Sequence, residues 1–216
     1  MPKSVLVCAA HPDDEVLGCG GAIARHTAEG DKVQILFFTD GVSARENNLS
    51  IEGQDRQKAA NEAVHILGAE VVGCCYFPDQ QLETVPLLKL TKILERYNPN
   101  IIYTHHLGDL NLDHHFVAQA VLTAFRPLPG SAVEAIYGFE TLSSTEWASE
   151  EIFVPTRFVA IDIEKKLAAL EEYQSEMRDF PHPRSYDGVR ALAMLRGMTV
   201  GLRAAEAFTV LREVVQ

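Results

Sequence analysis

The stretch that decides the fold is SVLVCAAHPDDEVLGCGGAIARHTAEGDKVQILFFTDG, residues 4–41. It opens with a continuous apolar run, Ser4–Ala10, which predicts a buried strand. The residues Glu15–Glu29 follow a helical pattern that ends at Gly30. A second apolar run, Lys32–Thr39, predicts another buried strand. A strand, a helix and a second buried strand indicate a parallel β-α-β unit with a right-handed crossover.

The same alternation continues through the first hundred residues. Short apolar runs rich in Val, Ile and Leu predict two further strands, and longer amphipathic runs predict two further helices: Gln54–Leu67 (helix), Val71–Phe77 (strand), Val85–Tyr97 (helix) and Asn100–Thr104 (strand). Strands that are apolar on both faces need helices on both sides of the sheet. The predicted fold is therefore α/β: a Rossmann-like, doubly wound, mostly parallel sheet with helices on both faces.

The pattern is looser in the second half of the chain. It predicts three helices and two strands: His114–Phe125 (helix), Ala132–Phe139 and Phe153–Ile161 (strands), Glu164–Met177 and Val189–Arg203 (helices). A polar, proline-punctuated loop, residues 182–188, separates the last two helices. Neither repeats nor an interdomain linker are evident, so residues 1–216 are predicted to form a single domain.

Composition and charge exclude several classes of function. The net charge is −11 and the basic residues are dispersed, which argues against a nucleic-acid partner. No apolar run approaches the roughly 20 residues of a transmembrane helix, and the first residues do not resemble a signal peptide. The four cysteines lack CxxC spacing, which suits reduced thiols. We therefore expect a cytoplasmic protein; a homo-oligomer is compatible with the sequence, which does not decide the oligomeric state.

The first chemically informative segment is HPDDE, residues 11–15, directly after the first predicted strand. Open α/β sheets bind ligands at the carboxyl ends of their strands, and this segment lies there. His11 and Asp14 are three residues apart and can face the same side, which would supply half of a zinc site. The alternative is a helix N-cap, with Asp13 or Asp14 accepting from backbone N–H groups. That alternative leaves His11 unexplained.

The second informative segment is HHLGDLNLDHH, residues 105–115, after the fourth predicted strand. Strands one and four of a doubly wound sheet can end side by side, so one histidine here could complete a three-ligand zinc site. His114 is favoured because it begins a helix and directly follows Asp113, a carboxylate that could orient it. For His105 and His106 taken singly, an exposed polar loop is the simpler interpretation.

These motifs together resemble the PIG-L/LmbE-like N-deacetylases. The AHPDDE–GCGG opening and the NxDH step onto a helix carry the resemblance, which extends over most of the chain. It implies that His11, Asp14 and His114 hold zinc and that Asp13 is the general base. It also implies a substrate contact for Arg56, near the start of the second helix, although a solvated helix residue explains Arg56 equally well.

The chain departs from the family at one position. Several members have histidine three residues before the zinc histidine, where it helps to stabilise the oxyanion, and this chain has Asn111. An asparagine amide can donate a hydrogen bond to an oxyanion but cannot supply a proton. His105 and His106 are the candidates for that missing part and for contacts to the substrate.

The resemblance thus implies zinc-dependent hydrolysis of an N-acyl group, with acetyl favoured, from a small-molecule amino sugar or sugar conjugate. Another divalent transition metal would also suit the ligand set. One alternative is a nucleotide-binding Rossmann enzyme, but HPDDE occupies the place of its glycine loop. A second alternative is a descendant that binds metal or sugar without catalysis, and the presence of Asp13 argues against it.

Overall fold

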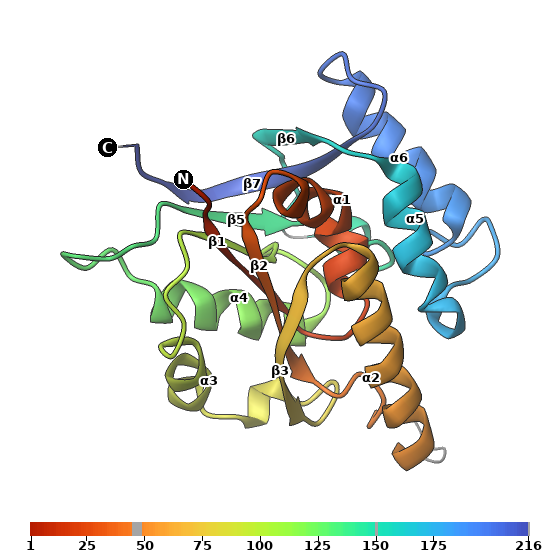
Figure 1. Ribbon diagram of the computed structural model, residues 1–216. Coiled ribbons are helices and arrows are strands. Elements are labelled where there is room, and N and C mark those ends of the chain that lie inside the picture. The colour runs from red at the N-terminus through yellow and green to blue at the C-terminus, as the bar shows by residue number, and fades with distance from the viewer. Residues whose placement is uncertain (45–48, 150, 216) are drawn as a thin grey trace.

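The computed structural model describes residues 1–44, 49–149 and 151–215, with only the backbone course for residues 49–51. The described residues form one seven-stranded sheet in the order β3-β2-β1-β4-β5-β7-β6 (Figure 1). The strands are β1 (Ser4–Ala9), β2 (Lys32–Thr39), β3 (Glu70–Phe77), β4 (Ile101–His105), β5 (Ala135–Phe139), β6 (Arg157–Ala160) and β7 (Ala205–Glu213). The first five strands pair with one another in parallel, so the predicted Rossmann-like, mostly parallel sheet is confirmed.

Helices cover both faces of the sheet, as Figure 1 shows. One face carries α1 (Asp14–Ala28), α2 (Leu49–Ile66), α5 (Ile163–Glu171) and α6 (Tyr186–Met198), and the other carries α3 (Leu87–Leu94) and α4 (Leu112–Ala124). Alternate residues of β1 explain this division, since Val5 and Val7 pack into the first core cluster and Leu6 and Cys8 into the second. Within the described residues, no helix is both long and apolar enough to cross a bilayer.

The strand order reverses direction at β1. This strand pairs in parallel with β2 on one side and with β4 on the other. The helices that follow β1 and β4 lie on opposite faces, which opens a crevice beyond the carboxyl ends of these two strands. The HPDDE loop and the loop after His105 both leave the sheet at this point, as the sequence predicts.

The last strand, β7, is a correction to the sequence-based prediction. It pairs antiparallel with both β5 and β6, whereas the sequence pattern suggested no strand after a helix running to Arg203. That helix, α6, ends at Met198. The predicted helix Glu164–Met177 is likewise shorter: α5 ends at Glu171 and is followed by a 3-10 turn, η3 (Gln174–Glu176). Two other 3-10 turns are η1 (Leu82–Thr84) and η2 (Thr145–Trp147).

Glycines let α1 lie close to its neighbours in the fold. A Cβ atom on Gly18 would lie 2.2 Å from the ring of Phe139, and one on Gly21 would lie 2.5 Å from the side chain of Ile161. Real Cβ atoms do not approach this closely, so these positions require glycine. The same run interrupts the helix, because Cys19 has the non-helical dihedrals φ −145° and ψ 21°.

A buried ion pair satisfies the backbone groups that this interruption exposes. The Glu206 carboxylate in β7 accepts from the N–H groups of Gly21 and Ala22, at 2.8 and 2.7 Å. Lys166 in α5 donates to Glu206 at 2.7 Å and to a carbonyl oxygen of α1 at 2.7 Å. Buried charges and N–H groups are costly unless paired, so Glu206 and Lys166 together stabilise the broken helix.

Candidate metal centre and active site

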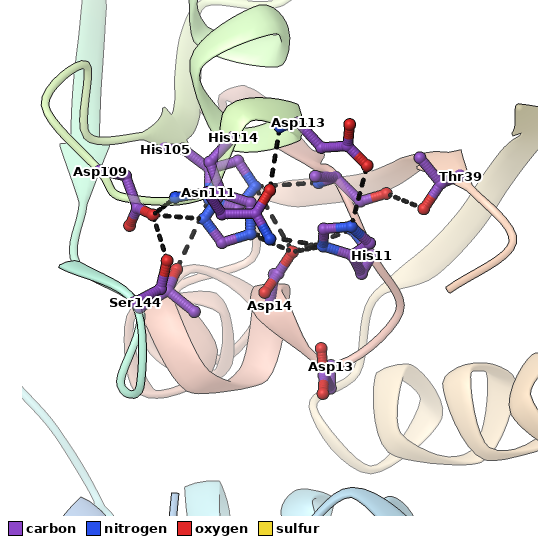
Figure 2. Close-up of polar contacts among 12 residues, drawn as sticks. His11, Asp13, Asp14, Thr39, His105, Asp109, Asn111, Asp113, His114 and Ser144 are labelled. Carbon is purple, nitrogen blue, oxygen red and sulfur yellow. Dashed lines mark hydrogen bonds and ion pairs between the residues drawn. The ribbon is translucent and has the colours of Figure 1, made fainter. Parts of the chain in front are cut away.

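Three donor atoms from separate segments converge at the crevice. His11 follows β1, Asp14 is the first residue of α1, and His114 lies in the first turn of α4. The Oδ2 atom of Asp14 lies 3.0 Å from Nδ1 of His11 and 3.3 Å from Nε2 of His114, and the two nitrogens are 3.3 Å apart. All three side chains are buried, and Figure 2 shows them pointing at one another. The structure thus brings together the three residues that the sequence nominated as metal ligands.

Each imidazole has one nitrogen that points away from the other two ligands, and that nitrogen lies close to a carboxylate. Nε2 of His11 lies 3.2 Å from Oδ2 of Asp113 and 3.0 Å from Oδ1 of Asp79. Nδ1 of His114 lies 3.0 Å from Oδ1 of Asp109. A carboxylate accepts a hydrogen bond from the ring N–H, which fixes the tautomer and leaves the other ring nitrogen with its lone pair. Three lone-pair donors therefore face one point.

The charges around the cluster favour a cation at its centre. Burial opposes a charged imidazole, yet the Asp14 and Asp109 carboxylates raise the pKa of His114 to about 9. Burial likewise opposes charge on His11, while Asp14, Asp113 and Asp79 raise its pKa well above the usual value. In the metal-free protein a bound proton meets this demand. A divalent metal meets it better, because ligands about 2.0–2.1 Å from a tetrahedral zinc ion lie roughly 3.3 Å apart, as these donors do.

The structure assigns the orienting carboxylates differently from the sequence. We expected Asp113 to orient His114, its neighbour along the chain. Instead the Asp113 carboxylate contacts the ring of His11, and the Asp109 carboxylate contacts the ring of His114. The reason is helical geometry, since adjacent residues on a helix point about 100° apart and do not face each other. The Asp113 carboxylate also accepts from two backbone N–H groups of the loop after β3, at 2.8 and 3.0 Å.

Asp109 is held by a short loop that follows β5. The hydroxyls of Ser144 and Thr145 each donate to one of its carboxylate oxygens, and the backbone N–H of Asn111 donates to Oδ1 at 2.9 Å. Burial opposes ionisation, but the hydrogen bonds from His114, Ser144 and Thr145 hold the pKa of Asp109 below its usual range. Asp109 is thus an ionised partner for His114, and the sequence analysis gave it no role.

Asp13 adopts a strained backbone conformation beside the cluster. Its φ of 124° and ψ of −27° lie where non-glycine residues rarely occur, at a cost of about 1–3 kcal/mol. The Glu15 carboxylate supports this conformation by accepting from the Asp13 N–H at 2.9 Å. Glu15 in turn accepts from the Tyr173 hydroxyl at 2.7 Å. Neighbouring groups thus hold the Asp13 backbone in a conformation that costs free energy, and such strain is typical of functional sites.

Two arginines bind the same oxygen of Asp13. Nη2 of Arg56 lies 3.1 Å from Oδ2, and Nη1 of Arg184 lies 2.9 Å from it. Within the described residues no partner is found for Oδ1. Arg56 is buried, contacts Glu176 and lies over the Tyr173 ring, so it offers almost no surface to a substrate. This position argues against the predicted substrate contact and makes Arg56 a positioning residue for Asp13.

Arg184 was missed by the sequence analysis. It lies in the polar loop of residues 182–188, which the sequence marked only as a loop. Its hydrogen bond to Asp13 joins residues 171 positions apart. An arginine in a polar loop close to several prolines was the only signal that the sequence offered.

His105 and His106 are buried rather than exposed. Nε2 of His105 accepts from the Ala10 N–H at 2.9 Å, and its ring stacks on His114 with centroids 3.8 Å apart. Nε2 of His106 lies 3.2 Å from the carbonyl oxygen of Glu151. Burial and the neighbouring His114 lower the pKa of His105 well below its usual value. These contacts argue against the predicted roles of both histidines in substrate binding or proton supply.

Asn111 caps α4. Its Oδ1 accepts from the Asp113 N–H at 2.9 Å, which is the structural alternative to a catalytic role. The cap uses only the oxygen, and Nδ2 has no protein partner within the described residues. Figure 2 shows the amide beside the cluster, on the side between His11 and His114. A cap and a donor to substrate are therefore compatible in this side chain.

The comparisons with known proteins agree with this geometry. Residues 6–125 match the family described as PIG-L, GlcNAc-PI de-N-acetylase, and this span is more than half of the 216 residues. The chain belongs to the PIG-L family. The matched span contains every proposed metal ligand and Asp13, but it excludes Arg184 and the loop that holds Asp109.

Individual PIG-L relatives differ in their reactions. YaiS of Escherichia coli, an uncharacterized deacetylase, is 32% identical over 184 residues, which cover 80% of this chain and 91% of YaiS. The 4-oxalmesaconate hydratase of Pseudomonas putida is 30% identical over 125 residues, 52% of this chain and 47% of the hydratase. The crystal structure of the conserved protein TT1542 from Thermus thermophilus is 28% identical, with a TM-score of 0.77 and coverage of 99% and 97% of the two chains. Family membership alone therefore does not fix the reaction.

Proposed function

We propose that the protein is a zinc-dependent hydrolase that removes an N-acyl group, in the first instance acetyl, from an amino sugar or a sugar conjugate. One observation carries the proposal. A cluster of three lone-pair donors, His11, Asp14 and His114, lies next to an aspartate whose second carboxylate oxygen has no protein partner within the described residues. A metal-assisted hydrolase needs both parts, a site for the cation and a base for the water.

A zinc ion held by His11, Asp14 and His114 would polarise the amide carbonyl and lower the pKa of a water molecule to about 7. The donors suit this ion, since zinc accepts imidazole nitrogen and carboxylate oxygen and catalytic sites commonly supply three protein ligands. Asp109 and Asp113 keep the two imidazoles in the tautomers that ligation needs.

Asp13 takes the proton from the water through Oδ1. Arg56 and Arg184 bind Oδ2 and hold the carboxylate in one orientation, so the reactive oxygen is fixed in place. The same Oδ1–H then donates the proton to the nitrogen of the leaving amine, since His105 and His106 are held in other contacts. A single carboxylate thus serves both halves of the proton transfer.

Asn111 stabilises the developing oxyanion. The cap fixes its Oδ1 and thereby aims Nδ2, which can donate to an oxygen that becomes negative during attack. A neutral amide donor performs this part without supplying a proton, which is why Asp13 carries the acid step.

The amino-sugar assignment is supported by the family description, a de-N-acetylase of a GlcNAc conjugate. The acyl group rests on the deacetylase relative. The cytoplasm remains our proposed compartment, because the four cysteines are all free thiols, which suits a reducing environment.

The direct test measures acetate release by the zinc-loaded protein from N-acetylglucosamine, di-N-acetylchitobiose and an N-acetylglucosaminyl glycoside. We expect zinc-dependent release from at least one of them. Asp13→Asn should keep zinc and lower the rate by about 10²–10⁴-fold, the usual contribution of a general base.

The hydratase relative supplies the competing outcome. If the zinc-loaded protein releases no acetate from any of these sugars but hydrates an unsaturated dicarboxylate such as 4-oxalmesaconate, the proposed reaction is wrong. Near-normal turnover by zinc-loaded Asp13→Asn would instead remove Asp13 from the mechanism and leave the reaction class standing.

A further inference from the structure

The loop after β5 contacts both halves of the site. Ser144 and Thr145 donate to Asp109, the carboxylate behind His114. The preceding residue, Ser143, accepts through its hydroxyl from Nε of Arg184 at 3.1 Å, and Arg184 binds Asp13. Residues 143–145 therefore bridge the proposed metal ligands and the proposed base. One exposed side chain of this loop lies two residues further along the chain.

That side chain is Trp147. It is 51% exposed, although a large aromatic ring normally buries most of its surface. The His182 ring meets it edge-on, with centroids 5.9 Å apart and planes at 88°. The loop itself is well anchored, because the Glu146 carboxylate accepts from the backbone N–H groups of Ser143 and Ser144, at 2.6 and 3.2 Å. An anchored loop thus presents an indole ring that no other ring stacks upon within the described residues.

We propose that Trp147 stacks on the pyranose ring of the substrate, and that this contact selects a sugar as the carrier of the acyl group. The proposal rests on the proposed function, since it names the part of the substrate that this residue holds. It makes Trp147 a specificity-determining residue without a part in the proton transfers.

The chemistry around Trp147 favours a sugar over an apolar aglycone. A pyranose has an apolar C–H face that packs against an aromatic ring, and hydroxyls at its edge that need hydrogen-bond partners. Both kinds of group are present here: the indole supplies the apolar face, and His182 lies beside it as a polar group. Arg184 connects His182 to Asp13, because its backbone N–H donates to Nδ1 of His182 at 3.1 Å and its side chain donates to Asp13.

The sequence provides a clean signal for the test, because Trp147 is the only tryptophan in the chain. Fluorescence excited at the indole band therefore reports on this residue alone. We would titrate the zinc-loaded Asp13→Asn protein with N-acetylglucosamine and with di-N-acetylchitobiose, and use N-methylacetamide as the matched amide without a ring. We expect a saturable change with the sugars and none with N-methylacetamide. The same initial change in the wild-type holoenzyme would show that Asp13→Asn has not altered the surroundings of Trp147.

Variants of Trp147 separate stacking from a structural role. Trp147→Ala should raise KM for the sugar about 10-fold, the scale of one aromatic stacking contact with its buried area, with a smaller change in kcat. Trp147→Phe keeps a ring and should recover most of this loss, while zinc content stays equal in both variants.

The outcomes distinguish this proposal from the proposed function. Saturable fluorescence changes without acetate release would support Trp147 stacking and overturn the deacetylation. Acetate release with no fluorescence response, or with KM unaffected in Trp147→Ala, would overturn the stacking alone. A saturable response to N-methylacetamide would also overturn it, because the ring would then not be what Trp147 recognises.

Discussion

Asp13 and Asp14 are adjacent in the sequence, but different kinds of group balance the negative charges of their carboxylates. The Asp14 carboxylate faces two imidazoles, whose positive charge depends on a bound proton or metal. The Asp13 carboxylate faces two guanidiniums, which are charged at every accessible pH. Figure 2 shows the two side chains pointing in different directions. Asp14 thus suits a cation that can be exchanged, and Asp13 is paired with cations that are always present.

The difference indicates how one short segment supplies two chemical roles. A carboxylate whose partner can leave is suited to bind metal. A carboxylate whose partners cannot leave is held ready to transfer protons, since its orientation does not depend on metal. The strained φ of 124° at Asp13 is what turns its side chain away from that of Asp14.

The largest expected effect comes from Asp14→Asn. An amide is a poorer ligand and removes the negative charge, so zinc content should fall to a small fraction of one ion per chain. Activity should fall by more than about 10³-fold, because the metal contributes several kcal/mol and each 1.36 kcal/mol is tenfold. Atomic absorption of the purified variant and acetate release measure both effects.

Asp13→Asn is the matched control, because it makes the same exchange of a carboxylate oxygen for an amide NH₂ at the neighbouring residue. It should keep its zinc and still lose most of its activity. The distinction between Asp14 as a metal ligand and Asp13 as a base is wrong if Asp14→Asn retains full zinc, or if Asp13→Asn loses it.

A smaller effect is expected at Asn111. Asn111→Asp keeps the cap, because aspartate caps helices as well as asparagine, but it replaces the Nδ2 donor with a negative charge. We expect kcat to fall about 10–100-fold with little change in thermal stability, less than for a sole oxyanion donor because zinc shares the charge. Asn111→Ala should lower kcat too and also cost about 1 kcal/mol of stability through the lost cap. Full activity in a zinc-loaded Asn111→Asp protein would leave the cap as the whole explanation of this residue.

The smallest effect is a pH dependence of the exchangeable site. The pKa of His114 is raised from 6.5 to about 9 in the metal-free protein. The proton therefore stabilises the metal-free fold fully below pH 6.5, and this stabilisation is lost as the pH rises towards 9. Protons become scarcer over that window, so zinc displaces the His114 proton more easily as the pH rises. The difference in Tm between zinc-loaded and metal-free protein should therefore widen from pH 6.5 to 8.5, by on the order of 5 °C.

The difference in Tm between the two forms is used because it removes the effect of a second titrating group, Glu15. Burial raises the pKa of Glu15 to about 8, so its contribution to stability is also lost as the pH rises from 4.5 through 8. That loss is common to the two forms and cancels. A constant difference in Tm across the window would mean that His114 does not bind zinc.

The parts of the fold that local pattern determines were predictable. The strands around β1 are continuous apolar runs, and their helices have clear ends, so the sheet and its switch point followed from the sequence. The switch point then placed His11 and Asp14 next to the end of β4. The last strand, β7, was not predictable in this way, because its partners β5 and β6 are distant in the sequence and its outer half is only partly buried.

The same division applies to the site. His11, Asp14 and His114 occur in motifs at strand ends, so their convergence follows from topology. Arg184 and Asp109 depend on loops whose course is set by contacts far along the chain, and no periodicity reveals such contacts. The assignment of Asp113 to His114 failed because proximity in sequence was taken for proximity on a helix.

The buried Glu206–Lys166 ion pair at the break of α1 has a consequence for the order in which parts of the protein fold during synthesis. The N–H groups of Gly21 and Ala22 need the Glu206 carboxylate, which a ribosome adds 185 and 184 residues later. Until then the helix that begins at Asp14 has unpaired backbone groups at its middle, and its lysine partner on α5 has no counter-charge. Domains generally fold as units during synthesis. We therefore expect the proposed ligands His11 and Asp14, which leave the ribosome early, to be among the last groups fixed in place, so that a metal would bind after translation.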